Sequence, residues 1–133
     1  MKKALDPHSA LRSLAARLAQ PRWSSAGAVA TGMLGAHRAR ARSFDAGLTV
    51  ALTLDRPVSQ APEACLLLAS TPEACDDALY LADDSLWLLR RFPERLTEVE
   101  FDLLLKQQLA LAALLAGRDR APPLVLPIAG RYA

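Results

Sequence analysis

The side chains that could do chemistry are few in this sequence, and they do not form a recognisable catalytic set. His8 and His37 are the two histidines, and no carboxylate or thiol pattern accompanies either one. General acid–base and nucleophilic catalysis both need such partners, so we interpret both histidines as surface residues. Two acidic pairs, at residues 76–77 and 83–84, fall in segments expected to be turns, where carboxylates bind backbone amides more often than they share a proton. The sequence therefore predicts no catalytic residue.

Motifs for metals and cofactors are also missing. The sequence contains no H-x-x-x-H or C-x-x-C spacing, no Gly-rich phosphate loop and no G-x-S-x-G element. Cys65 and Cys75 are the two cysteines, and their spacing is unlike a metal knuckle or a disulfide framework, so we expect free thiols in a reducing compartment. We therefore expect a cytoplasmic protein with no metal, no cofactor and no enzymatic activity. The small-residue segment 26–36 is too short to cross a bilayer.

One charged pattern stands out, a row of arginines at every second position. Arg38, Arg40 and Arg42 alternate with two alanines, which predicts three guanidinium groups on one exposed face of a strand. Such a row could bind a phosphate backbone or an acidic partner protein. No aromatic residue is interleaved with it, and the same alternation keeps an exposed strand soluble. The net charge is only +2, so any nucleic-acid binding must depend on this row alone, and we keep a regulatory nucleic-acid-binding module as the alternative function.

Alternation and short apolar runs predict the strands. The clearest is the run after the arginine row, where Leu48, Val50, Leu52 and Leu54 alternate with threonine and alanine, as in a half-buried antiparallel strand. A turn at residues 45–47 makes it a hairpin with the arginine row. In all, we predict about five strands, at residues 38–42, 48–54, 65–68, 78–82 and 85–92.

Helices are predicted at both ends of these strands. Asp6 and Pro7 indicate an N-cap and a first-turn proline, and they begin a helix over residues 7–20. Thr97 and Glu100 have the spacing of a capping box that begins a second helix, over residues 96–117. Strands flanked by helices, without alternating βαβ units, predict an α+β fold in which both helices pack on one antiparallel sheet.

The second helix has apolar residues on two sides. Its main face contains Phe101, Leu104, Leu105, Ala112 and Leu115, whereas Leu103, Ala110 and Leu114 fall opposite. A helix of this kind needs two neighbours, so we expect a sheet on one side and a partner chain on the other. A helix at the centre of a single core is the alternative.

The length of 133 residues suits one domain, which we place at residues 1–117. Residues 118–133 contain three prolines among apolar residues, which excludes a regular helix. We interpret this C-terminal segment as a tail, either flexible or docked in extended form on a groove.

Three segments resemble the class I chaperones of bacterial type III secretion, the CesT and SycE type, and within them the YscB-like members. They are FDAGLTVALTLD at 44–55, DDSLWLLRRFPE at 83–94 and LTEVEFDLLLKQQLALAALLAG at 96–117, in this order after an amphipathic helix. The resemblance implies a non-enzymatic α+β subunit that binds the N-terminal part of a secreted effector or gatekeeper polypeptide in extended form. It also implies a homodimer, or a heterodimer with a second small chaperone.

Positions in the resemblance suggest residues for these contacts. The client-binding candidates are Leu11, Leu14, Leu18, Leu48, Val50, Leu52 and Leu54. Each would look the same in the sequence if it only filled the core. The candidates for the dimer interface are Leu79, Leu81, Leu86, Trp87, Leu103 and Leu114. The family has a helix between its third and fourth strands, and here the predicted strands leave only residues 70–77 for one.

Overall fold

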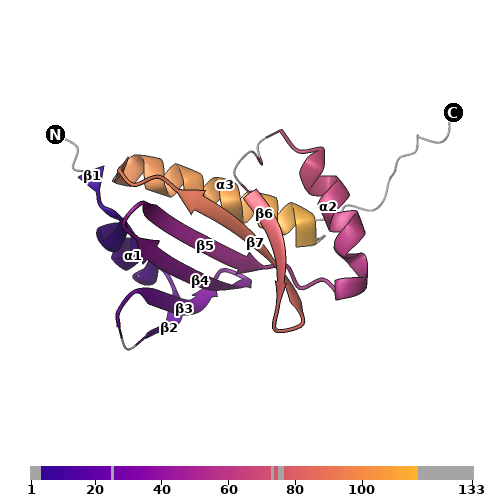
Figure 1. Cartoon of the computed structure of the whole chain (residues 1–133), viewed down its shortest axis with the longest axis horizontal. Helices are drawn as coiled ribbons and strands as arrows, with labels where there is room; N and C mark the ends of the chain where they lie inside the picture. Colours follow the sequence, from indigo (N-terminus) through magenta and orange to yellow (C-terminus); the bar gives the residue numbers. More distant parts are fainter. Residues whose placement is uncertain (1–3, 25, 73, 75–76, 117–133) are drawn as a thin grey trace, which may run out of the picture.

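The computed structural model describes residues 4–24, 26–72, 74 and 77–116, which form an α+β fold (Figure 1). Six antiparallel strands form a sheet of order β2-β3-β4-β5-β7-β6, and a second sheet pairs β1 with β8. The strands are β1 (Ala4–Leu5), β2 (Ala19–Trp23), β3 (Val29–Leu34), β4 (His37–Phe44), β5 (Gly47–Thr53), β6 (Asp77–Ala82), β7 (Ser85–Phe92) and β8 (Leu96–Thr97). The helices are α1 (Pro7–Ala15), α2 (Ala61–Ala69) and α3 (Glu98–Ala116), with a short 3-10 turn, η1 (Val58–Gln60), before α2.

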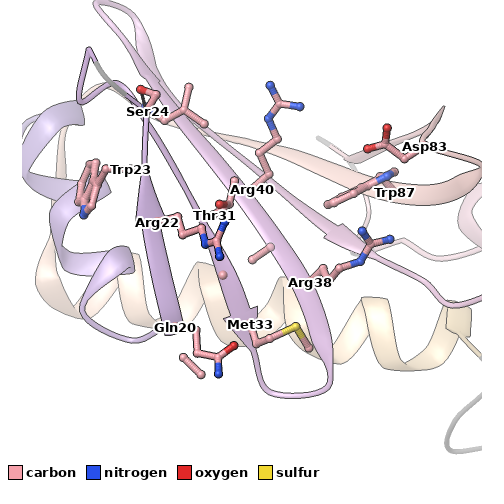
Figure 2. A pocket seen from close by; sticks show the side chains of 14 residues that line it. Gln20, Arg22, Trp23, Ser24, Thr31, Met33, Arg38, Arg40, Asp83 and Trp87 are labelled. Carbon is pink, nitrogen blue, oxygen red and sulfur yellow. Dashed lines mark hydrogen bonds between the residues drawn. The ribbon is translucent and has the colours of Figure 1, made fainter.

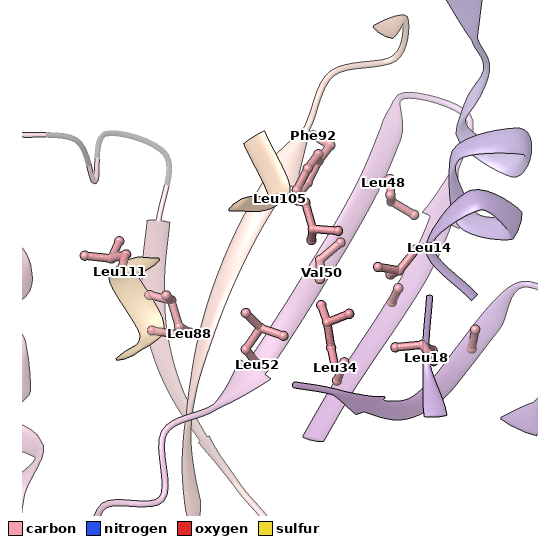
Figure 3. Packing of buried hydrophobic residues seen from close by; sticks show 14 of the residues in the cluster. Leu14, Leu18, Leu34, Leu48, Val50, Leu52, Leu88, Phe92, Leu105 and Leu111 are labelled. Carbon is pink, nitrogen blue, oxygen red and sulfur yellow. The ribbon is translucent and has the colours of Figure 1, made fainter. Parts of the chain in front are cut away.

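The helices lie on one face of the six-stranded sheet, which we call the covered face. Alternate residues of β4, β5 and β7 point to this side and join side chains of α1, α2 and α3 in one apolar core (Figure 3). The other residues of the same strands lie on the opposite side, which we call the open face. The predicted fold class is therefore confirmed, and the described helices cover one face of the sheet and not the other.

Local signals at the start of α3 behave as predicted. The Thr97 hydroxyl accepts a hydrogen bond from the Glu100 amide at 3.1 Å, and the Glu100 carboxylate accepts one from the Thr97 amide at 2.8 Å. This reciprocal pair is a capping box. The side chains of Leu96 and Phe101, which flank it, are both buried. Gly117, the predicted end of the helix, lies outside the described residues.

The turn between β6 and β7 is tight although it contains no glycine. Asp83 and Asp84 have φ angles of 53° and 59°, and the register runs without a shift up to the pair Ala82 and Ser85. Two successive left-handed residues between paired strands are typical of a type I′ turn, and Asp tolerates this conformation better than most residues. The second predicted hairpin is confirmed.

The prediction of a strand at residues 65–68 is wrong, because these residues belong to α2. Pro62 lies in the first turn of this helix, and Leu67 and Leu68 pack partly buried against the core. A run of four apolar residues carries too little periodicity to separate a strand from one side of a helix. The correction puts a helix between β5 and β6, ahead of the residues 70–77 that we considered for one.

The first predicted helix is too long, and two strands after it were not predicted. Helix α1 ends at Ala15, and β2 begins at Ala19, so the described part of the large sheet has six strands instead of about five. Leu18 continues the apolar spacing of α1 but is buried from the loop that follows the helix. Gly32 of β3 lies directly beneath it, because a Cβ atom there would be 3.0 Å from the Leu18 Cβ atom. Because such a position needs a small residue, β3 lacks the alternation of large apolar and polar side chains that predicts a strand.

Candidate functional site

The seven candidates for client binding all lie in the core. Leu11, Leu14, Val50, Leu52 and Leu54 are 0% exposed, and the other two are at most 7% exposed. They belong to the core between the helices and the covered face, as Figure 3 shows for five of them. Of the two interpretations that the sequence left open, the structure therefore supports core packing, and an apolar groove for a client must be sought elsewhere.

The six candidates for a dimer interface divide into two groups. Leu86 and Trp87 are buried within the subunit, at 2% and 5% exposure, and Leu79 is half-buried. Leu81, Leu103 and Leu114 are 55%, 61% and 49% exposed. Only the second group offers apolar side chains that another chain could reach.

Four exposed apolar residues of α3 fall on one side of the helix, and we call them the outer stripe; the exposed Lys106 and Gln107 lie between its two halves. It consists of Val99, Leu103, Ala110 and Leu114, and spacings of four, seven and four residues keep them on one side of the helix. Val99 is 58% exposed, and the opposite side of α3 packs on the sheet through Phe101, Leu105, Leu111, Ala112 and Leu115. The prediction of a helix with two apolar sides is thus confirmed, whereas the alternative of a wholly buried helix is wrong.

A buried ion pair anchors the edge strand β6. The Asp77 carboxylate accepts hydrogen bonds from Arg90 Nε at 2.8 Å and from Arg90 Nη2 at 2.6 Å, and both side chains are at least 95% buried. Arg90 Nη1 also donates to the Gln107 side chain at 2.7 Å and to the Leu104 carbonyl oxygen at 3.3 Å. The guanidinium group therefore joins β6, β7 and α3. Arg90 lies on the apolar face with Leu86 and Leu88, and a charge on such a face signals a buried partner.

The free edge of β6 is regular and lies beside an apolar hollow. All six residues of the strand pair with β7 without a bulge, and no described strand lies on the other side. A hollow of about 360 Å³ separates β6 from α2, and its lining includes Leu68, Ala69 and Leu79. On α2, Leu66 is 72% exposed. An edge of this kind can accept an additional strand.

The residues considered for catalysis have structural roles or lie apart from one another. His37, contrary to prediction, is buried, and its Nδ1 donates to the Thr53 carbonyl oxygen at 2.7 Å. His8 is exposed, and Asp83 and Asp84 form the turn described above. The exposed thiol of Cys65 is free, whereas Asp76 and Cys75 lie outside the described residues. Among the residues that the structure describes, no group of three His, Cys, Asp or Glu side chains is placed to bind a metal.

The arginine row lies on the open face, as its alternation predicts. Arg38, Arg40 and Arg42 are exposed, and the alanines between them are buried on the covered face. The structure adds residues that the row alone could not reveal, because they come from neighbouring strands. In the strand register, Thr31 of β3 lies between Arg22 of β2 and Arg40. Thr49 of β5 lies in the same way between Arg42 and Arg91 of β7.

Aromatic rings also lie beside this row. The Arg38 guanidinium is 5.4 Å from the centre of the Trp87 ring, and Trp87 stacks on Tyr80 with 6.2 Å between ring centres. Burial raises the pKa of the Tyr80 hydroxyl, whereas the charge of Arg40 opposes this increase. At the other end of the row, Arg42 lies 5.1 Å from the centre of the Phe44 ring. Phe44 continues the alternation of the row on β4, whereas Trp87 and Tyr80 come from other strands and only the strand register brings them beside the arginines.

Comparisons with known proteins gave no match, neither to a model of a protein family nor to a curated protein. Within the described part of the chain, no helix combines the length and apolar character needed to span a membrane.

Proposed function

We propose that this protein is a non-enzymatic chaperone or accessory protein of type III secretion. In the cytoplasm, it would bind the N-terminal region of a secreted effector or gatekeeper polypeptide in extended form, together with a second small subunit. The observation that carries the proposal is the outer stripe of α3. Its leucines, Leu103 and Leu114, remain largely exposed although the helix already packs on a complete core.

The order of elements supports the resemblance on which the proposal draws. With α2 between β5 and β6, the strands and helices from α1 to α3 include the helix that the family has between its third and fourth strands. Among the described elements from α1 to α3, the edge strand β2 and the short strand β8, which pairs with β1, are additional. The corrected position of α2 therefore strengthens the proposal.

The two edges of the sheet suggest where an extended client would bind. Strand β2 contains Pro21 and a register shift between Ala19 and Arg22, and Gln20 has a φ of 54°. Proline and bulges protect an edge strand from pairing with other chains. Strand β6 has neither device, so we assign the client to its free edge, with client side chains in the hollow beside α2.

The outer stripe suits the second subunit. The stripe has two apolar halves, Val99 with Leu103 and Ala110 with Leu114, on either side of Lys106 and Gln107. These halves can pack against a helix of a partner, whereas strand addition needs free backbone groups. The partner can be a second copy or a different small chaperone, and both forms of the proposal predict the same contact. A dimer through this stripe would leave the β6 edge available to the client.

Co-purification from the native host, followed by mass analysis, tests the proposal. We expect a second small subunit or the N-terminal region of a secreted polypeptide to be recovered. The double variant Leu103→Ser/Leu114→Ser should lose the second subunit, whereas the control Val58→Ser, at a residue with 42% exposure away from α3, should keep it. A chain that stays monomeric and without polypeptide partners would contradict the proposal.

Hydrogen exchange tests the assignment of the client to β6. Amides in Asp77–Ala82 that point away from β7 should exchange more slowly when the client is bound, and amides of β2 should not change. Protection at β2 instead would show that the assignment of the edges is wrong. The alternative function, binding of nucleic acid by the arginine row, depends on a different surface, the open face.

A further inference from the structure

The open face of the sheet carries a concentration of positive charge that no carboxylate of the described residues neutralises. Five exposed arginines make up this surface, which we call the basic face. They are Arg22, Arg38, Arg40, Arg42 and Arg91. None of the five forms an ion pair with a carboxylate of the described residues. The ion pairs that do form lie elsewhere, at Arg17–Asp102, Arg56–Glu63, Arg90–Asp77 and Lys106–Asp102.

Because these five charges have no carboxylate partner among the described residues, an anionic ligand would stabilise them. Arginines two positions apart on a strand are about 7 Å apart, so three like charges along β4 repel one another. Bound carboxylates or phosphates would remove this repulsion and accept charge-assisted hydrogen bonds from the guanidinium groups. Among the described residues that line the hollow at this face, Asp83 has the one carboxylate, and it lies at the rim beside Trp87 (Figure 2).

The shape of the face fits an extended chain. Arg22, Arg38 and Arg40 border a hollow of about 520 Å³, whose floor includes Thr31 and Met33 of β3 (Figure 2). In an extended polypeptide, side chains at every second position point the same way and repeat at about 7 Å, which is also the spacing of the row. Acidic residues at alternate positions would therefore match the arginines one to one.

The aromatic rings argue against single-stranded nucleic acid as the ligand. Binding of bases depends on exposed ring faces on which they can stack. Trp87 is only 5% exposed, with Arg38 over its ring and Tyr80 stacked beside it. Phe44 is 46% exposed, but Arg42 lies over its ring. Two of the rings therefore already carry an arginine, and Trp23, which is 42% exposed and lines the hollow, is a single stacking ring beside five arginines.

We propose that the basic face binds an acidic, extended polypeptide segment of a partner protein, with Asp or Glu at alternate positions. This surface is separate from the β6 edge and from the outer stripe of α3. The inference therefore goes beyond the function proposed above, and the failure of either one leaves the other intact.

Fluorescence anisotropy with labelled peptides tests the ligand class. The probe is a 12-residue peptide that alternates Glu and Ser, and the comparisons are the same composition with all Glu in one block, the Gln–Ser peptide and an oligothymidylate of equal charge. We expect the alternating peptide to bind most tightly, to weaken as salt rises and to lose measurable binding when Gln replaces Glu. Equal binding of the block peptide would overturn the alternating geometry. Tighter binding of the oligothymidylate would overturn the choice of polypeptide in favour of nucleic acid.

Arginine variants test the site. The triple change Arg38→Gln/Arg40→Gln/Arg42→Gln should weaken binding of the alternating peptide about tenfold, from three exposed charge contacts. A control with the same loss of charge, Arg12→Gln/Arg95→Gln/Lys106→Gln, alters exposed residues outside the open face and should change affinity less than about twofold. If both triple variants weaken binding equally, the peptide responds to the net charge of the protein, and the assignment of the site to the basic face is wrong. Arg40→Gln alone, which keeps both arginine–ring contacts, should weaken binding about twofold and serves if the triple variant does not fold.

Discussion

The two faces of the six-stranded sheet are best compared along β7, where consecutive residues lie on opposite sides. On the covered face, Leu88 is 0% exposed and Arg90 is bound to Asp77, whereas on the open face Leu89 is half-buried and Arg91 is exposed. The same residue types thus appear twice, one position apart, in different surroundings. The difference teaches that the cover of the helices, more than residue type, decides the burial of these two pairs, although Trp87 of the same strand is buried on the open face by Arg38 and Tyr80.

Breaking the ion pair of the covered face should have the largest effect. Asp77→Ala leaves the Arg90 guanidinium buried without its carboxylate, and we expect the free energy of unfolding to fall by about 3–5 kcal/mol. Arg91→Gln, on the open face, should change it by no more than about 0.5 kcal/mol. Urea denaturation measures both. Equal losses would mean that the pair Asp77 and Arg90 is not buried in solution.

Leu88 and Leu89 allow the same comparison between the covered and open faces with uncharged side chains. Leu88→Ala should lower the free energy of unfolding by about 2–5 kcal/mol, because it removes fully buried methyl groups and leaves a cavity. Leu89→Ala removes the same atoms from a half-buried site and should cost less than half as much. Urea denaturation of the two variants gives the ratio. A ratio near one would require a partner to cover the open face in the free protein.

These matched residues also show how far the sequence alone leads. Alternation in β5, the capping box of α3 and the second hairpin are local patterns, and each could be predicted because nearby residues determine it. The length of α1 and the strand β3 could not, since small residues such as Gly32 reflect the close approach of Leu18. Gln108 was not expected in the core either. It is fully buried and donates to the Val50 and Leu88 carbonyl oxygens at 2.8 and 3.3 Å.

The candidate surfaces divide in the same way. The outer stripe of α3 could be predicted because it lies on one helix, and the arginine row because it lies on one strand. Trp87 and Tyr80 reach the row only through the pairing of β4 with β5, of β5 with β7 and of β7 with β6. Leu48, Val50 and Leu52 could not be assigned to core or groove, because burial depends on where α1 and α3 pack.

Neutralising one charge of the open face should leave stability almost unchanged. Arg40 is exposed between two other arginines, and Arg40→Gln should alter the free energy of unfolding by at most about 0.5 kcal/mol in either direction. Thermal or urea unfolding of the purified variant measures the change. A loss above about 1.5 kcal/mol would show that the open face contributes to the fold and not only to binding.

The ionisation of Tyr80 offers the smallest and most local measure of the open face. Tyr132→Phe leaves Tyr80 as the one tyrosine of the chain, and ultraviolet absorbance should then give a pKa above the ordinary value, mainly because of burial. Removing the positive charge with Arg40→Gln should raise this pKa further, whereas Asp83→Asn should lower it.

Because the pKa is raised by folding, the contribution of Tyr80 to stability is complete below a pH of about 10 and is lost as pH rises through the pKa of the folded state. A pKa unchanged by Arg40→Gln would place that arginine away from the ring.

The pairing of β1 with β8 has a consequence for the order in which the protein assembles during translation. Ala4 and Leu5 pair with Thr97 and Leu96, so residues near the start of the chain wait for a strand that the ribosome makes more than 90 residues later. At roughly 5–20 residues per second, this delay lasts several seconds, and the leucines of β5 lack the cover of α3 from their own synthesis onward. The nascent chain would therefore be most exposed to aggregation before α3 is made, and slower translation of α3 should reduce the soluble yield.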